Sequence, residues 1–182
     1  MTFNFEDKVK ELVKKTKRGD YTAPYKLGKL YLEIEEHKNE KTALKWFKKA
    51  AKMSCTPAYY EIAKLYQNGQ GLKVNRKKAF TNMYLAGKDF EIKAFYELYL
   101  MYKEGKGTKK DQDAAFLWLY RAAETGENRA YFPLAQALCA SLEDKSEAQK
   151  EEALKWMEKA SQAGSTEAAQ FLAKNEQIES PK

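Results

Sequence analysis

The residue types that usually carry catalysis or bind metals are few and scattered in this sequence. His37 is the single histidine, and no cysteine or carboxylate accompanies it at the spacing of metal ligands. Cys55 and Cys139 lie 84 residues apart, which predicts two reduced thiols. Catalysis needs titratable groups that converge in a closed site. We therefore expect no enzyme activity, no metal site and no cofactor.

Two Gly-x-Gly pairs are the other chemical signal, because glycine-rich loops can cradle phosphates. They are Gly69-x-Gly71 and Gly105-x-Gly107. Both nucleotide-binding fingerprints require a strand before the glycines, whereas each pair here follows an apolar stripe with helical spacing. We expect these glycines to end a helix through a positive φ instead.

The elements around the second glycine pair form one repeating unit, from Lys93 to Asn128. Within it, two apolar stripes with helical spacing flank the glycine turn. The first stripe is Ala94, Leu98 and Tyr102, and the second is Ala115, Trp118 and Ala122. The unit therefore predicts two helices joined by a turn.

The same unit recurs along the chain. Its first-helix alanine returns in steps of 35, 36 and 36 residues, as Ala23, Ala58, Ala94 and Ala130. Its second-helix alanines return with a partner seven residues on, as Ala43 and Ala50, Ala79 and Ala86, Ala115 and Ala122, and Ala153 and Ala160. A fixed period of this length is typical of solenoids, in which each helix pair buries its apolar face against its neighbours. The sequence predicts an all-α, right-handed α/α solenoid of about four repeats.

We expect an N-terminal capping helix in residues 1–20 and four repeats over 21–164, at about 21–55, 56–91, 92–127 and 128–164. A C-terminal capping helix in 165–175 and a flexible tail in 176–182 follow. Asn39, Asn75 and Asp111 precede the second helices and are good N-cap residues. In the fourth repeat, Pro133 predicts a first helix that either starts late, near Phe132, or is bent, and the second helix is expected over Glu151–Ala163.

The order of these landmarks resembles the Sel-one-like repeat, a relative of the tetratricopeptide repeat. The resemblance covers residues 21 to 173 and is clearest in the third repeat. It rests on Ala23, Leu27, Gly28 and Tyr31 in a first helix, and on Ala115, Trp118, Ala122, Ala123 and Gly126 in a second. The chain departs from the pattern at Asn82, where tryptophan is usual, and at Phe90, where glycine is usual. The resemblance implies an interaction scaffold or adaptor.

The first helices also predict a partner-binding surface on the concave side of the solenoid. An aromatic residue recurs on the side of each first helix opposite its core stripe. A second position on the same side follows it four residues later. The eight predicted partner-binding residues are Tyr25, Lys29, Tyr60, Lys64, Tyr96, Leu100, Phe132 and Gln136. The alternative is that this aromatic column only packs the first helices together, because Tyr59, Phe95 and Tyr131 stand next to it. Trp46, Trp118 and Trp156, on second helices, are expected in the core.

The predicted partner is a protein or peptide with apolar anchors and acidic side chains. Lysine and arginine number 33 against 26 aspartate and glutamate, a net charge of +7 that favours an acidic partner. A cognate bacterial toxin that the chain would neutralise is one such partner. The alternative function is nucleic-acid binding through base stacking, which the interleaved acidic residues disfavour.

The sequence also predicts where the protein resides. Its first residues show no basic region followed by an apolar stretch, and no apolar run approaches the roughly 18 residues of a membrane span. We therefore expect a cytoplasmic protein without membrane insertion. The oligomeric state is left open.

Overall fold

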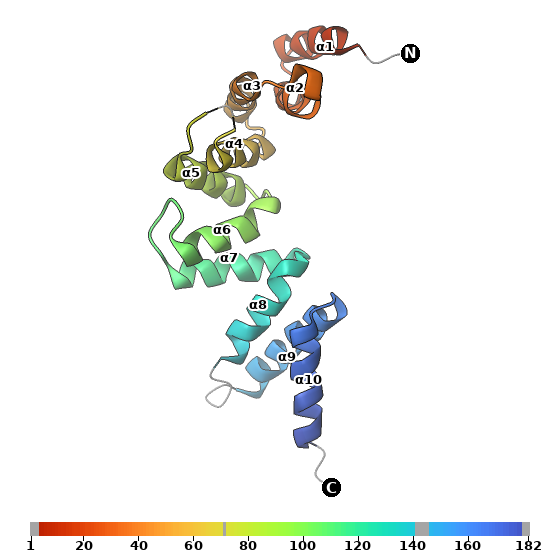
Figure 1. The fold of residues 1–182 in the computed structure, drawn as a ribbon, viewed down its shortest axis with the longest axis vertical. Coiled ribbons are helices and arrows are strands. Elements are labelled where there is room, and N and C mark those ends of the chain that lie inside the picture. Colours follow the sequence, from red (N-terminus) through yellow and green to blue (C-terminus); the bar gives the residue numbers. More distant parts are fainter. Residues whose placement is uncertain (1–3, 71, 141–145, 180–182) are drawn as a thin grey trace. The chain divides into compact units, whose positions relative to one another are not determined.

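The structure is a computed structural model that describes residues 4–70, 72–140 and 146–179, with side chains as far as residue 174. These residues form α-helices and one short 3-10 helix, with no strand among them (Figure 1). The chain divides into two compact units, Met1–Lys110 and Asp111–Lys182. The expected all-α repeat fold is confirmed.

The first unit contains the predicted capping helix, two complete helix pairs and the first helix of a third. Each helix packs against the one before it in the chain, from α1 to α6. The elements are α1 (Phe5–Lys17), α2 (Ala23–Glu33), η1 (Glu35–His37), α3 (Glu40–Lys52), α4 (Pro57–Asn68), α5 (Arg76–Lys88) and α6 (Lys93–Glu104). The expected pairing of first and second helices is therefore present, with α2, α4 and α6 as first helices.

The second unit continues the alternation. It holds α7 (Gln112–Glu124), α8 (Asn128–Cys139), α9 (Glu147–Gln162) and α10 (Thr166–Glu179). Of the two alternatives for the first helix of the fourth repeat, the late start is wrong, because α8 begins at Asn128 and contains Pro133; the bend stays a prediction. The proline removes one backbone donor, but Ala130 and Leu134 on either side of it are fully buried and hold the helix in place.

Two further boundaries differ from the predictions. Helix α9 starts four residues before Glu151 because Ser146 and Gln149 form a capping box, with Gln149 N–H donating to Ser146 Oγ at 3.4 Å. Helix α10 continues to Glu179, so residues 176–179 do not belong to the expected tail. Glutamate and glutamine are good helix formers. The expected turn residues 141–145 and the last residues, 180–182, lie outside the described part of the chain.

The recurring alanines are buried in the interior of both units. Ala23, Ala58 and Ala94 on first helices and Ala43 and Ala79 on second helices have no exposed surface. The second unit repeats this with Ala130 and Ala153, also fully buried. A small side chain lets two helices approach closely while larger neighbours fill the remaining space.

Gly28 of α2 leaves space for a side chain of α3. A methyl group at Gly28 would lie 2.5 Å from the ring of Phe47 on α3, and Phe47 is itself fully buried. The Leu-Gly pair at 27 and 28 therefore makes room for an aromatic side chain from the partner helix.

The predicted N-caps of the second helices and the predicted glycine ends of α4 and α6 are confirmed. Asn39, Asn75 and Asp111 each cap a second helix, accepting a backbone N–H at 2.9 Å. Gly69 and Gly105 end α4 and α6 with φ values of 70° and 72°. Gly71 lies outside the described residues.

Second helices and the capping helix end in a recurring left-handed residue. Gly19, Ser54, Phe90, Gly126 and Gly164 occupy it, and each has a positive φ. The next residue donates its N–H back into the last turn, as Glu91 does to Ala86 at 2.9 Å. Two of the five positions thus place a side chain where glycine is favoured, and Phe90 is also 76% exposed.

We expect Ser54→Gly and Phe90→Gly to raise the stability of the protein. The left-handed conformation costs a non-glycine residue about 1–2 kcal/mol, and the greater freedom of glycine in the unfolded chain offsets about 0.4–1 kcal/mol of this gain. Thermal unfolding should show a midpoint about 2–4 °C higher for each kcal/mol gained. Ser54→Gly is the cleaner test, because Phe90 also contacts the Phe95 ring. A lower midpoint in both variants would contradict the expected strain.

Gly107→Ala should destabilise the first unit far more than Gly19→Ala. Both glycines have a positive φ, 82° and 91°, but only a Cβ at Gly107 would collide with backbone, at 2.1 Å from the Arg76 carbonyl oxygen. We expect a loss of about 1 kcal/mol for Gly19→Ala from backbone strain and a further loss of about 1–3 kcal/mol for Gly107→Ala from overpacking. Urea unfolding of both variants measures the difference, and equal losses would refute the steric explanation.

Candidate protein-binding surface

Six of the eight predicted partner-binding residues belong to the first unit. They come from α2, α4 and α6, and together they define what we call the first-helix surface: Tyr25, Lys29, Tyr60, Lys64, Tyr96 and Leu100. All six are half-buried. Phe132 and Gln136 lie on α8 of the second unit, where Phe132 is half-buried and Gln136 is exposed.

The neighbouring aromatic column of Tyr59, Phe95 and Tyr131 also takes part in packing. Phe95 is 2% exposed. The Tyr59 hydroxyl donates to the Ala51 carbonyl oxygen at 3.4 Å, and in the second unit the Tyr131 ring lies 5.7 Å from that of Trp156. The tyrosines of the first-helix surface keep part of their area in solvent. The choice between a partner-binding column and a packing column stays a prediction, because residues of both columns are half-buried.

Tyr25 shows how such a residue is held. Its ring packs 5.7 Å from the ring of Phe47, and its hydroxyl donates to Glu61 Oε1 at 3.4 Å. Burial, followed by the negative charge of Glu61, raises the pKa of the Tyr25 phenol. The ring is thus fixed on one side by the core and at its tip by the next repeat.

Ion pairs connect successive first helices on the same surface. Lys29 Nζ of α2 lies 3.4 Å from Glu61 Oε1 of α4, and Lys64 Nζ of α4 lies 3.9 Å from an oxygen of Glu97 on α6. The side chains of Glu61 and Glu97 are only 16% and 14% exposed. These pairs repeat once per helix pair and place acidic groups between the tyrosines.

Lys29 makes a second pair within its own helix, to Glu33 at 2.9 Å. Burial opposes the charge on Lys29, but the hydrogen bond to Glu33 and the charge of Glu61 outweigh it and raise the lysine pKa. The positive charge of this residue is therefore retained and shared between two carboxylates.

Glu61 and Glu97 are residues of this surface that sequence reasoning missed. Their only signal is spacing, because they follow Lys29 and Lys64 by 32 and 33 residues. Their presence changes the expected chemistry: the two lysines that were to attract an acidic partner are already paired. The first-helix surface is consequently an aromatic surface with alternating charges.

The other candidate residues do not converge. The His37 ring is stacked on Phe5 at a centroid distance of 3.9 Å. Cys55 is buried, and burial raises the pKa of its thiol. Among the described residues, no group of three or more histidine, cysteine, aspartate or glutamate side chains is placed to hold a metal ion.

Two of the three tryptophans lie in the core as predicted. Trp118 is 5% exposed and Trp156 is 7% exposed. Arg121 and Lys159 lie over their respective rings, at 4.9 Å and 4.1 Å from the centroids. Trp46 is only partly buried, and it packs against the cluster of Leu12, Ala23 and Leu27.

No helix in the described part of the chain is long and apolar enough to cross a membrane.

The chain consists of helix pairs that repeat about every 36 residues and pack through buried alanines. These features place it among the helical repeat proteins. The chain belongs to the Sel1 repeat family, whose model matches residues 23–55, 56–89, 94–126 and 130–165. Sel1 repeat proteins generally mediate protein–protein interactions, and their repeats form a scaffold without catalytic chemistry.

Solved structures with a similar fold come from bacteria. A Sel1 repeat protein from Oxalobacter formigenes is 26% identical, with a TM-score of 0.71 over 90% of this chain and 67% of that one. A protective antigen with an SLR fold from uropathogenic Escherichia coli, c5321, is 27% identical, with a TM-score of 0.75 over 94% of this chain and 36% of that one. The Helicobacter pylori cysteine rich protein B shares the fold at 18% identity, with a TM-score of 0.55 over 69% of this chain and 91% of its own.

The chain thus spans about a third of the length of the Escherichia coli protein. Among curated proteins, none is similar enough to this chain to count as a match.

Replacing Glu61 with glutamine should lower the pKa of Tyr25 without returning it to the ordinary value of 10.0. The negative charge of Glu61 opposes formation of the phenolate, so its removal makes deprotonation easier, while burial of the ring persists. Carbon-13 NMR titration of labelled tyrosine measures the change, with Glu97→Gln as the control that leaves Tyr25 unaffected. An unchanged Tyr25 titration in Glu61→Gln would show that the two groups are not coupled.

Proposed function

We propose that this protein is an interaction module that binds a protein or peptide on its first-helix surface. The observation that carries the proposal is the row of half-buried tyrosines, one on each successive first helix of the first unit. Tyrosine offers a large apolar face together with a polar tip, which makes it effective in protein interfaces. Phe132 and Gln136 on α8 provide a corresponding surface in the second unit.

The contacts between repeats prepare this surface for binding. Tyr25 is held by Phe47 and Glu61, and Lys29 is held by Glu33 and Glu61. A side chain that is already ordered loses less conformational entropy when a partner binds. The partner that fits best has apolar side chains at the spacing of the tyrosines, with polar or charged groups between them.

The net charge of the chain favours faster association with an acidic partner. The net charge of +7 accelerates the approach of an acidic protein, while the paired Lys29 and Lys64 contribute little further attraction once it is bound. The specific role that we propose is a cytoplasmic bacterial adaptor, and within that class an inhibitor or immunity protein of a cognate toxin. The bacterial origin of the similar structures supports the bacterial setting.

Loss of two tyrosine rings should remove the partner from the protein. Affinity capture with the wild type, followed by binding measurements on the purified partner, should show a strong loss for Tyr60→Ala/Tyr96→Ala. Tyr84→Ala/Phe116→Ala is the matched control, because it also deletes two partly exposed rings, on α5 and α7, outside the proposed surface.

Circular dichroism must show that both double variants remain helical. Equal capture of the same proteins by wild type and Tyr60→Ala/Tyr96→Ala would disprove the proposed surface. Recovery of nucleic acid in place of protein, with binding that falls steeply as salt is added, would favour the alternative function.

A further inference from the structure

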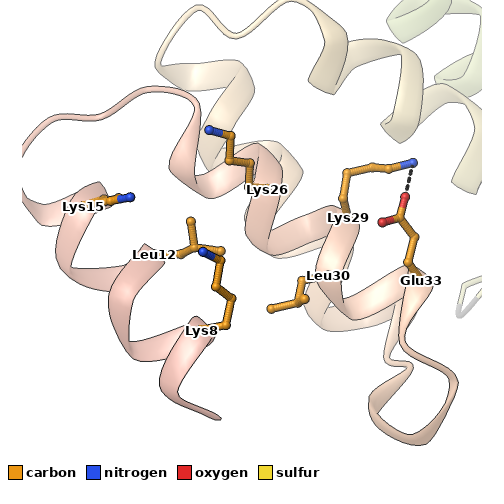
Figure 2. A pocket seen from close by; sticks show the side chains of 7 residues that line it. All are labelled: Lys8, Leu12, Lys15, Lys26, Lys29, Leu30 and Glu33. Carbon is orange, nitrogen blue, oxygen red and sulfur yellow. Dashed lines mark ion pairs between the residues drawn. The ribbon is translucent and has the colours of Figure 1, made fainter. Parts of the chain in front are cut away.

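A lysine-rich pocket lies between the capping helix α1 and the first helix α2. It has a volume of about 360 Å³ and is lined by Lys8, Leu12, Lys15, Lys26, Lys29, Leu30 and Glu33. The lining residues follow helical spacing, so one face of each helix contributes to it. Figure 2 shows Leu12 and Leu30 between the two helices, with the lysine side chains arranged around them.

Positive charge predominates around this pocket. Lys8 and Lys15 share one carboxylate, that of Glu11, at 2.8 Å and 2.6 Å. Hydrogen bonds from Lys15 and then Lys8 lower the pKa of Glu11 to about 2, so this carboxylate stays charged at neutral pH. On the opposite helix, Lys29 pairs with Glu33 at 2.9 Å. Lys29 also lies 3.4 Å from Glu61 Oε1, so the four lysines face three paired carboxylates, those of Glu11, Glu33 and Glu61.

Lys26 differs from the other three lysines of the pocket, which all form ion pairs. It is exposed and forms no ion pair in the part of the chain that the structure describes. Asp20 acts on it from a longer distance: hydrogen bonds from Thr22 and, to a smaller extent, the charge of Lys26 lower the pKa of the Asp20 carboxyl. Lys26 stands one helical turn before Lys29 and Leu30 on α2. An anionic group beside Lys26 would therefore gain a charge partner without displacing an existing ion pair.

The floor of the pocket is apolar. Leu12 is 3% exposed in the folded chain, and Leu30 is half-buried against the same cluster. A site for a free inorganic anion needs no leucine floor, whereas a peptide with an apolar side chain next to a carboxylate uses both features. The volume is near the lower end of the range of about 300–1,000 Å³ for ligand pockets, which suits a short segment.

We propose that this pocket binds an acidic peptide segment in which a glutamate or aspartate lies next to a leucine-like side chain. The apolar side chain contacts Leu12 and Leu30, and the carboxylates face Lys26 and Lys8. Lys29 lines the pocket and also belongs to the first-helix surface, so the two sites are continuous. This inference rests on the proposed function and adds the chemical class of the segment that binds at the α1 end.

A synthetic peptide tests the site directly. The probe is a fluorescein-labelled peptide of sequence Gly-Glu-Leu-Glu-Glu-Leu-Gly, measured by fluorescence anisotropy with the full chain at fixed salt. We expect Lys26→Glu to weaken its binding about fivefold or more, because the charge reversal replaces attraction with repulsion at the rim. Lys45→Glu is the matched control, since Lys45 is an exposed lysine of α3 outside the pocket and the change in net charge is the same.

Two altered peptides test the two chemical features separately. Replacing both leucines with serine should abolish binding if the apolar floor takes part, and replacing the glutamates with glutamine should abolish it if the lysines do. Equal affinity of wild type and Lys26→Glu, or full retention of binding by either altered peptide, would overturn the proposal. A single-stranded oligonucleotide that displaces the peptide at lower concentration than unlabelled peptide would overturn the choice of a peptide as occupant.

The same assay separates this pocket from the proposed function. If Tyr60→Ala/Tyr96→Ala loses its cellular partner but still binds the peptide, and Lys26→Glu loses the peptide, both proposals stand as distinct contacts. If Lys26→Glu loses the peptide while the tyrosine variant keeps its partner, the pocket is supported and the first-helix surface is refuted. If only the tyrosine variant loses binding, the pocket proposal fails and the first-helix surface remains.

Discussion

The contact on which the structure depends is the approach of one helix to the next through alanine. No helix of this chain has enough apolar surface to be stable alone, and a two-helix pair still leaves one face open. Fully buried alanines such as Ala58 and Ala79 bring successive helices close enough for larger side chains to fill the space between them. A larger residue at these points would separate the helices and expose the interior that the period of about 36 residues builds.

The same constraint determines which faces of the first helices remain in contact with solvent. Their inner sides are committed to packing, as Leu27, Ile62 and Leu98 show by their burial. The aromatic residues on the other sides of these helices differ in burial. Phe95 is buried, whereas Tyr60 and Tyr96 are half-buried and keep contact with solvent. The binding surface that we propose uses first-helix positions that keep part of their side-chain area in solvent.

The repeat landmarks could be predicted from sequence because each has a local physical cause. Asn39 and Asn75 cap helices wherever the backbone leaves free N–H groups, and Gly69 and Gly105 adopt a conformation that other residues disfavour. The capping box of Ser146 and Gln149 is also a local sequence feature. The start of α9 at Glu147 could therefore have been predicted from the sequence as well. Pro133 left two alternatives open, and the late start is excluded because packing of Ala130 and Leu134, a tertiary effect, outweighs a local preference.

The candidate sites were less predictable because their charges are paired across repeats. Sequence periodicity shows that Lys29 and Lys64 are equivalent, but it does not show which residue of the next helix reaches them. The contacts with Glu61 and Glu97 reverse the electrostatic interpretation of this surface, since paired lysines attract an acidic group weakly. In the pocket between α1 and α2, by contrast, four lysines line the cavity with Glu33 as the lining carboxylate, and Lys26 forms no ion pair among the described residues. Lys26 therefore differs from Lys29 and Lys64, whose charges are each paired with a carboxylate of the next first helix.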